Sequence, residues 1–164
     1  MAVALQAAEG VLVARYLQYM LDFMHKRGIS AERLLADTGL QADELRAHPD
    51  YFVSLPAFLR TLQNMHSLDT SPTLSFELGA TFNIGSHGFL GYAVQASPNL
   101  AEALLLVNRY ALTRTQLLQV SFVPDGHTVM LEVTDQGLLG PWFPHLIDAL
   151  LGSFQAIASE LFPD

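Results

Sequence analysis

Residues 85–110, GSHGFLGYAVQASPNLAEALLLVNRY, form the stretch of sequence that says most about the fold. Ser97 is a good helix N-cap and Pro98 is favoured at the first helical position, so the sequence predicts a helix over 98–113. Leucines extend the apolar face of this helix around most of its circumference. Such a helix is expected to be central or to lie in an interface.

The same stretch contains three glycines, each three residues from the next: Gly85, Gly88 and Gly91. A dinucleotide-binding loop has the spacing G-x-G-x-x-G after a strand, and a phosphate-binding P-loop places Gly-Lys-Ser/Thr at its end, so neither matches. We therefore interpret the glycines as packing residues: Gly85 ends a helix, and Gly88 and Gly91 let a short helix pack closely. Ser86 and His87 are adjacent and do not form a nucleophile elbow. A loop position or a ligand contact is the better prediction for His87.

Hydrophobic periodicity predicts the remaining elements on both sides of this stretch. Helices are expected over 11–27, in a short segment after Ser30, over 43–47, 55–67 and 72–81, and from 141 to about 161. Alternating residues in 116–123 and 128–133, separated by the turn sequence Pro124-Asp125-Gly126, predict a β-hairpin. The fold class predicted is α+β, mostly helical, with one hairpin between the central helix and the C-terminal helix.

The predicted hairpin raises a question about partners, because an isolated two-stranded sheet is marginal in water and has open edges. Either the hairpin packs fully on helices, or further strands come from beyond Asp164 or from a second subunit. The last alternative predicts a homodimer.

Composition excludes several classes of protein. The 164 residues are 51% apolar and 15% charged, with a net charge of −8 and no cysteine, which fits one globular domain over 1–164. The eight basic residues do not cluster, so we expect no contact with nucleic acid through this chain. We also expect a cytoplasmic protein without a membrane span, a cofactor or a catalytic site.

Polar groups close to the central helix are the candidate site. Arg109 and Arg114 either interact with the dipole at the helix C-terminus, or orient an anionic or polar ligand in an apolar pocket. The six histidines show no H-E-x-x-H pattern and no pair at i, i+4. A metal or haem site is therefore expected only if distant histidines converge.

At this stretch the chain resembles the N-terminal effector domain of AraC-type transcriptional regulators, in the group often labelled arabinose-binding-like. The similar positions are Gly88, Gly91, Tyr92, Ala93, Ser97, Pro98, Leu100, Glu102, Ala103, Leu104, Arg109 and Tyr110. Asn99 stands where the group usually has Thr. Arg27-Gly28-Ile29, Thr38-Gly39-Leu40 and Glu77-Leu78-Gly79 are also similar to the family pattern.

The resemblance implies a sensing and dimerisation domain that takes a small-molecule effector. On this basis His87, Tyr92, Arg109 and Tyr110 are the predicted ligand-binding residues. Family members continue into two helix-turn-helix units, which residues 1–164 lack, so we expect an N-terminal fragment of a longer regulator or a stand-alone relative. Two alternatives stay open: a small metal- or haem-binding protein, and a dimerisation module without a ligand.

Overall fold

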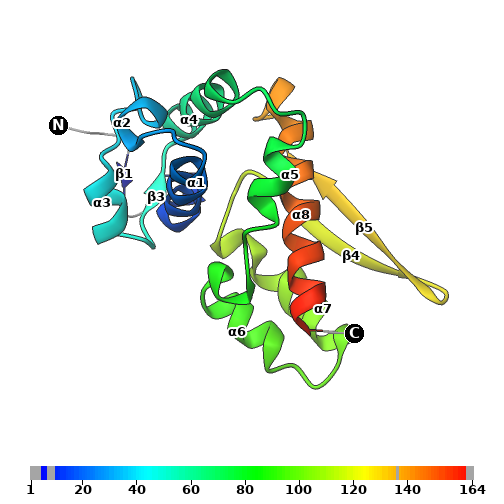
Figure 1. Ribbon diagram of the computed structural model, residues 1–164. Coiled ribbons are helices and arrows are strands. Elements are labelled where there is room, and N and C mark those ends of the chain that lie inside the picture. The colour runs from blue at the N-terminus through cyan, green and yellow to red at the C-terminus, as the bar shows by residue number, and fades with distance from the viewer. Residues whose placement is uncertain (1–4, 7–9, 136, 162–164) are drawn as a thin grey trace.

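Helices from the first and second halves of the chain form two groups that lie side by side (Figure 1). The structure is a computed structural model that describes residues 5–6, 10–135 and 137–161. The first half contains β1 (Leu5–Gln6), β2 (Leu12–Val13), α1 (Ala14–Lys26), α2 (Ala31–Leu34), α3 (Ala42–Ala47), β3 (Phe52–Val53) and α4 (Leu55–Leu68). The second contains α5 (Leu74–Gly79), η1 (Ile84–His87), α6 (Phe89–Gln95), α7 (Leu100–Tyr110), η2 (Ala111–Thr113), β4 (Gln119–Asp125), β5 (Thr128–Thr134), η3 (Gly140–Trp142) and α8 (Phe143–Leu161). The predicted α+β class is confirmed.

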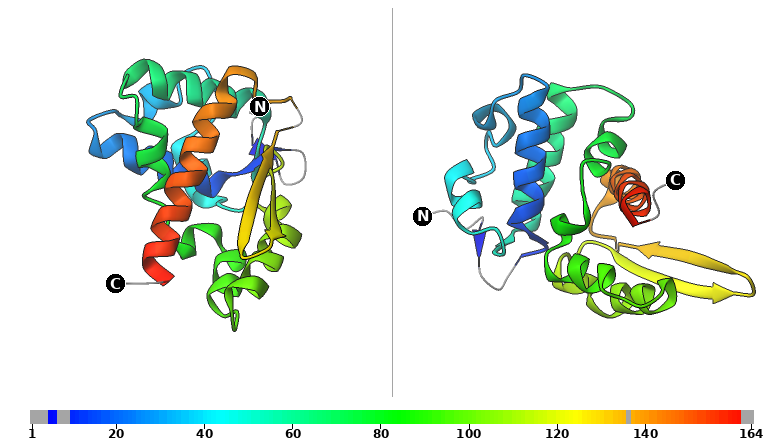
Figure 2. Two further views of the ribbon diagram at one scale, coloured as in Figure 1. Left: turned by 90° about the vertical axis from the view of Figure 1, so that its right-hand side faces the viewer. Right: turned by 60° about the horizontal axis from the view of Figure 1, so that its bottom comes forward.

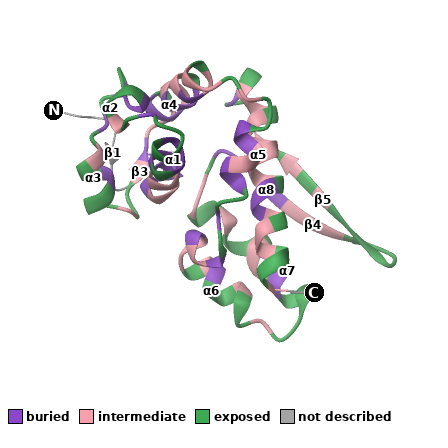
Figure 3. Cartoon of the chain, in the orientation of Figure 1, coloured by how far each residue is buried: buried purple, intermediate pink, exposed green. Residues whose placement is uncertain are grey.

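The first group is built around α1, whose apolar side chains repeat at helical spacing. Leu17, Met20, Leu21 and Met24 are almost inaccessible to solvent. Figure 3 shows buried positions on α1 and on the neighbouring α4. The helix predicted over 11–27 is therefore confirmed, although it begins at Ala14.

Residues just before α1 form part of a small antiparallel sheet that the sequence analysis did not predict. Its strands have two residues each, in the order β1-β3-β2. An isolated bridge between Leu12 and Thr115 then ties this sheet to a segment of the second half. The hydroxyl of Thr115 also donates to the carbonyl of Val11, at 3.0 Å. The start of α1 and residues 114–116 are thus held side by side.

The helices α5 and α8 cross at two glycines. A Cβ added to Gly79 would lie 1.9 Å from the Ala149 carbonyl oxygen, and one added to Gly152 would lie 2.2 Å from that of Phe76. Both distances are well below van der Waals contact, so only glycine permits this crossing. Figure 2 (right) shows α8, in orange and red, and α1, in blue, on either side of the green segment that follows α5.

The predicted hairpin is present as β4 and β5, with its first strand starting three residues later than expected. It packs on helices along one face: the rings of Phe122 and Phe154 lie 5.7 Å apart. The Asn108 side chain donates to the Phe122 carbonyl at 3.1 Å and accepts from the Phe122 amide at 2.8 Å. Val129 and Met130 are about half exposed, and the described residues provide no third strand for this sheet.

One prediction about α7 is wrong, and a second is reduced to one of its two alternatives. Its N-cap is Asn99, whose side chain accepts a hydrogen bond from the Glu102 amide at 2.9 Å, while the Ser97 hydroxyl donates to the Ala93 carbonyl. Pro98 therefore precedes the helix. The helix is not central, because Ala103 is its only buried residue and Leu105 is 65% exposed, so a position in an interface stays a prediction. An apolar sequence made the helix look central, but the hairpin and α6 cover only part of it.

The interpretation of the three glycines is partly confirmed. Gly85 lies inside η1 and does not end a helix, because α5 has already stopped at Gly79. Gly91 does allow close packing: a Cβ there would lie 1.8 Å from the Ile84 carbonyl oxygen. The predicted short helix is α6.

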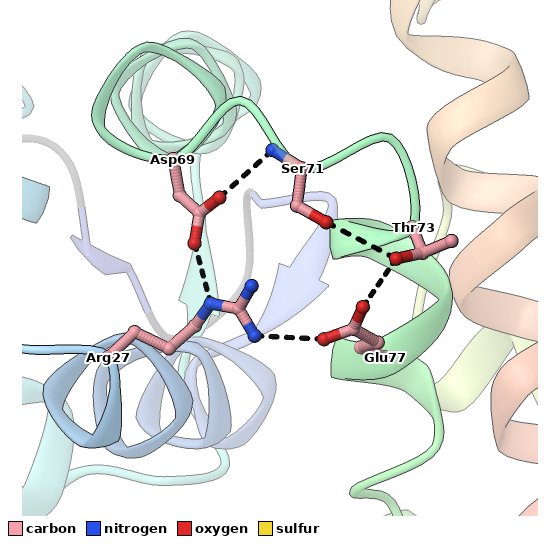
Figure 4. A network of polar contacts seen from close by, with 5 residues as sticks. All are labelled: Arg27, Asp69, Ser71, Thr73 and Glu77. Atoms are coloured by element: carbon pink, nitrogen blue, oxygen red, sulfur yellow. Dashed lines mark hydrogen bonds and ion pairs between the residues drawn. The ribbon is translucent and has the colours of Figure 1, made fainter.

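A polar network at the end of α1 ties the two groups together (Figure 4). Arg27 contacts Asp69 through Nε at 2.6 Å and Glu77 through Nη1 at 2.8 Å. Hydrogen bonding from Arg27 lowers the pKa of Asp69. The Thr73 hydroxyl donates to Glu77, and this contact, together with Arg27, lowers the pKa of that carboxyl group. The network fixes the connection between α4 and α5 against α1.

Candidate functional site

A cavity of about 180 Å³ lies where the two groups of helices meet. Side chains of α1 and α4 from the first group line it, together with side chains of α5, α7, α8 and residues 114–120 from the second group. Most of the lining is apolar. The polar residues in the lining are Tyr16, Ser75, His87, Arg114, Thr115, His145 and Ser153. A mostly apolar cavity with a few polar groups is typical of a small-molecule site.

His87 connects three elements at the wall of this cavity. Its Nδ1 lies 2.9 Å from the Tyr16 hydroxyl of α1, and its Nε2 lies 3.1 Å from the Ser153 hydroxyl of α8. Burial, aided by the charge of Arg114, lowers the pKa of His87 to about 4. The imidazole is therefore neutral at pH 7, so one ring nitrogen donates a hydrogen bond and the other accepts one.

Local sequence explains how His87 reaches this position. Asn83 and Ser86 form a capping box at the start of η1: the Ser86 amide donates to Asn83 Oδ1 and the Asn83 amide donates to Ser86 Oγ, both at 3.0 Å. Gly88 then ends the turn with a φ of +60°, a conformation that other residues rarely adopt. A Cβ at Gly88 would also lie 3.3 Å from Arg114 Cζ, so glycine gives the guanidinium room.

Arg114 is the charged group of the cavity wall, and its hydrogen bonding is incomplete. Its side chain is 12% exposed, and Nη1 lies 3.7 Å from Asp50 Oδ1. The same carboxylate oxygen is 3.3 Å from Nη2 of Arg15, so two arginines share one acid. Arg114 Nε and Nη2 are buried and have no hydrogen-bond partner within the described part of the chain. Buried donors without partners are costly, so these two nitrogens are available to a polar group that enters the cavity.

Tyr16 lies between these two groups. Its hydroxyl contacts His87, and the guanidinium carbon of Arg114 lies 6.0 Å from its ring centroid. Burial raises the pKa of the Tyr16 phenol, while the charge of Arg114 opposes that shift. The phenol therefore remains protonated at neutral pH and offers a hydroxyl beside the arginine.

The structure separates the four residues that the sequence predicted as ligand-binding. His87 lines the cavity, whereas Tyr92, Arg109 and Tyr110 do not. Tyr92 is 59% and Tyr110 is 43% exposed. Arg109 is exposed on α7, where it borders a separate surface depression with Leu105, Leu106 and Asn108. A role in ligand binding stays a prediction for these three residues.

Two cavity residues, Tyr16 and Ser153, were not predicted as site residues. The sequence pattern placed Tyr16 on the apolar face of the first helix. Its hydroxyl was therefore not considered as part of a binding site. Ser153 had a usable signal, because it follows Leu146, Ala149 and Leu150 at helical spacing and is a polar residue on the buried stripe of α8.

Two further histidines meet where α4 lies close to α8, and one of them, His145, lines the cavity. The His66 and His145 rings are 4.1 Å apart, and His66 Nε2 lies 3.1 Å from the Ser75 hydroxyl. Burial and the neighbouring His145 lower the pKa of His66. Across the residues that the structure describes, no group of three or more histidine or acidic side chains could hold a metal ion. Nor does that part of the chain contain a helix with the length and apolar character needed to cross a membrane.

Comparison with known proteins gives one family and one curated relative. Residues 28–164 match the family described as the arabinose-binding domain of AraC transcription regulators, N-terminal. The ornithine utilization regulator of Pseudomonas aeruginosa is 28% identical over 154 residues, which cover 94% of this chain and 45% of that protein. The chain therefore spans less than half the length of this relative.

Proposed function

Because the chain belongs to the family of N-terminal, arabinose-binding-type domains of AraC transcription regulators, we propose that it senses a small-molecule effector in the cavity described above. The position of that cavity carries the proposal: its walls come from both groups of helices. A molecule inside contacts both groups, so binding favours the arrangement in which they are closed together. We propose that this shift alters DNA binding by another part of the regulator.

The chemistry of the lining narrows the choice of effector. A sugar such as arabinose needs hydrogen-bond partners for each hydroxyl, and the mostly apolar wall offers few of them. Ornithine, which appears in the relative's name, carries two ammonium groups beside its carboxylate, and among the described residues no Asp or Glu lines the cavity to pair with them. The lining therefore supports an effector that is more apolar than either molecule.

Among the residues predicted from the sequence, we propose that His87 contacts the effector directly. Substitution of Arg109 tests whether the predicted residues outside the cavity also take part in binding. If Arg109→Ala weakens effector binding while the fold persists, the site extends across α7 to the surface depression. If affinity is unchanged, the site is confined to the cavity.

Native mass spectrometry of the chain, after incubation with a library of bacterial metabolites, tests the proposed function. We expect one small molecule to be retained per chain. Val107→Phe, which places a larger side chain in the cavity, should abolish retention. Leu105→Phe on the same helix is the matched control and should preserve it, because residue 105 lies outside the cavity lining. No retained molecule, or equal retention by Val107→Phe, would contradict the proposal.

We also propose that the chain self-associates through α7 and η2. Leu105 and Leu112 are 65% and 55% exposed, and their seven-residue spacing places them on one side of this segment. Sedimentation equilibrium should show a dimer that Leu105→Glu dissociates. A monomer at every concentration would contradict this proposal. A dimer that retains no metabolite would favour a dimerisation module without a ligand.

A further inference from the structure

We propose that the effector is an amphipathic monocarboxylate, with its apolar body in the cavity and its carboxylate on Arg114 and Tyr16. This inference rests on the proposed sensing function and adds the chemical class of the ligand to it.

The strongest observation is which atoms of Arg114 lack partners. Nη1 is the nitrogen near Asp50, while Nε and Nη2 are buried without a hydrogen bond among the described residues. Nε and Nη2 form one edge of the planar guanidinium. That edge presents two parallel N–H groups, which match the two oxygens of a carboxylate.

The charge around this edge favours an anion. Asp50 is shared between Arg15 and Arg114, so the three groups together carry one net positive charge. His87 is neutral, and no carboxylate in the described part of the chain lines the cavity to compete for the free edge of Arg114. An ammonium group at the same place would meet a cation in a poorly solvated site, where repulsion is strong.

Neighbouring groups hold the guanidinium ready for a ligand. The Val13 amide donates to the Arg114 carbonyl at 3.2 Å, which fixes the backbone of residue 114 beside α1. Gly88 has no side chain, so the guanidinium can lie close to the backbone at that position. The Tyr16 hydroxyl lies beside it and provides a further hydrogen-bonding group.

The volume sets the size of the apolar body. A protein cavity of about 150 Å³ accommodates benzene, which has six heavy atoms. A cavity of about 180 Å³ therefore suits a short aliphatic chain or one aromatic ring. Hexanoate has this size and the required charge, and hexylamine and 1-hexanol match it in length.

Titration calorimetry of the chain with these three probes tests the inference. We expect hexanoate to bind about 10-fold or more tightly than 1-hexanol, because hydrogen bonds to charged groups are the strong ones. Hexylamine should bind more weakly than either. Equal binding of the three probes, tighter binding of the amine, or no binding of hexanoate would overturn the inference. This comparison uses the unmodified chain, so it does not depend on how a variant folds.

Two variants then test whether the carboxylate of hexanoate binds at Arg114. Arg114→Gln should reduce hexanoate affinity to that of 1-hexanol and leave 1-hexanol affinity unchanged. Arg33→Gln, an exposed arginine on α2, removes the same charge and should have no effect on either probe. Equal loss in both variants would refute a specific role for Arg114. A third outcome is that hexanoate does not bind, while the chain still retains a metabolite that the Val107→Phe variant does not retain. In that case the proposed ligand class is wrong and the proposed sensing function stands. If no metabolite is retained either, the sensing function itself fails.

Discussion

Gly152→Ala is the substitution for which the structure gives the clearest magnitude. The new methyl carbon would lie 2.2 Å from the Phe76 carbonyl oxygen and 2.8 Å from the Ala80 nitrogen. Carbon and oxygen atoms that are not bonded prefer a separation of about 3.3–3.6 Å. Both clashing atoms are backbone, so α5 and α8 must move apart by about 1 Å.

Two effects of this substitution oppose each other. Alanine is favoured over glycine in a helix interior by about 1 kcal/mol. Overpacking costs about 1–3 kcal/mol, and the upper end applies here because no flexible side chain can absorb the clash. The net expectation is a loss of about 2 kcal/mol, or a Tm lower by about 4–8 °C for a chain of this size.

Urea denaturation and calorimetry measure this loss directly. Gln155→Ala, an exposed position on the same helix, is the control and should change stability by less than about 0.5 kcal/mol. Effector binding should weaken as well, because Leu150 and Ser153 of α8 line the cavity. If Gly152→Ala is as stable as the parent chain, the close crossing of α5 and α8 does not exist in solution.

Three further predictions follow from polar groups. His87 has a pKa of about 4 in the folded chain against 6.5 ordinarily, so below pH 6.5 the unfolded chain binds a proton that the folded chain does not, and acid destabilises the fold. The cost reaches roughly 3 kcal/mol near pH 4, and unfolding of His87→Gln measured from pH 7 to pH 4 should lack this component. Asn108→Ala removes both hydrogen bonds to β4 and should cost about 1–3 kcal/mol, with faster amide exchange in the hairpin; unchanged exchange would contradict this. Arg27→Met removes the ion pairs to Asp69 and Glu77, so it should destabilise the chain more at low salt than at high salt in melting experiments.

Long periodic segments were predictable from the sequence, because period 3.6 and period 2 leave a clear pattern over ten or more residues. The helix at 55–67 and the hairpin are examples, and both are present within a few residues of the expected bounds. Strands of two residues are too short to show any period, so β1, β2 and β3 were missed. The sequence also could not show that Asn99, and not Ser97, is the N-cap, because both residue types cap helices well.

The candidate site was predictable only in part, because it is assembled from residues far apart in the sequence. His87 stood out as a polar residue in a packed glycine-rich stretch. Its partners Tyr16 and Ser153 lie 71 and 66 residues away, and nothing local links them to it. Arg114 was noted as a possible anion contact, but only the structure shows which of its nitrogens lack partners.

The cavity draws its walls from Leu12 at one extreme and Phe154 at the other. During synthesis α8 is therefore the last wall to leave the ribosome, and the pocket does not exist until it has done so. A nascent or truncated chain without α8 leaves the face of α5 that packs on α8 uncovered and lacks one wall of the cavity. Under the proposed sensing function, effector recognition would therefore begin only after α8 has docked and completed the cavity.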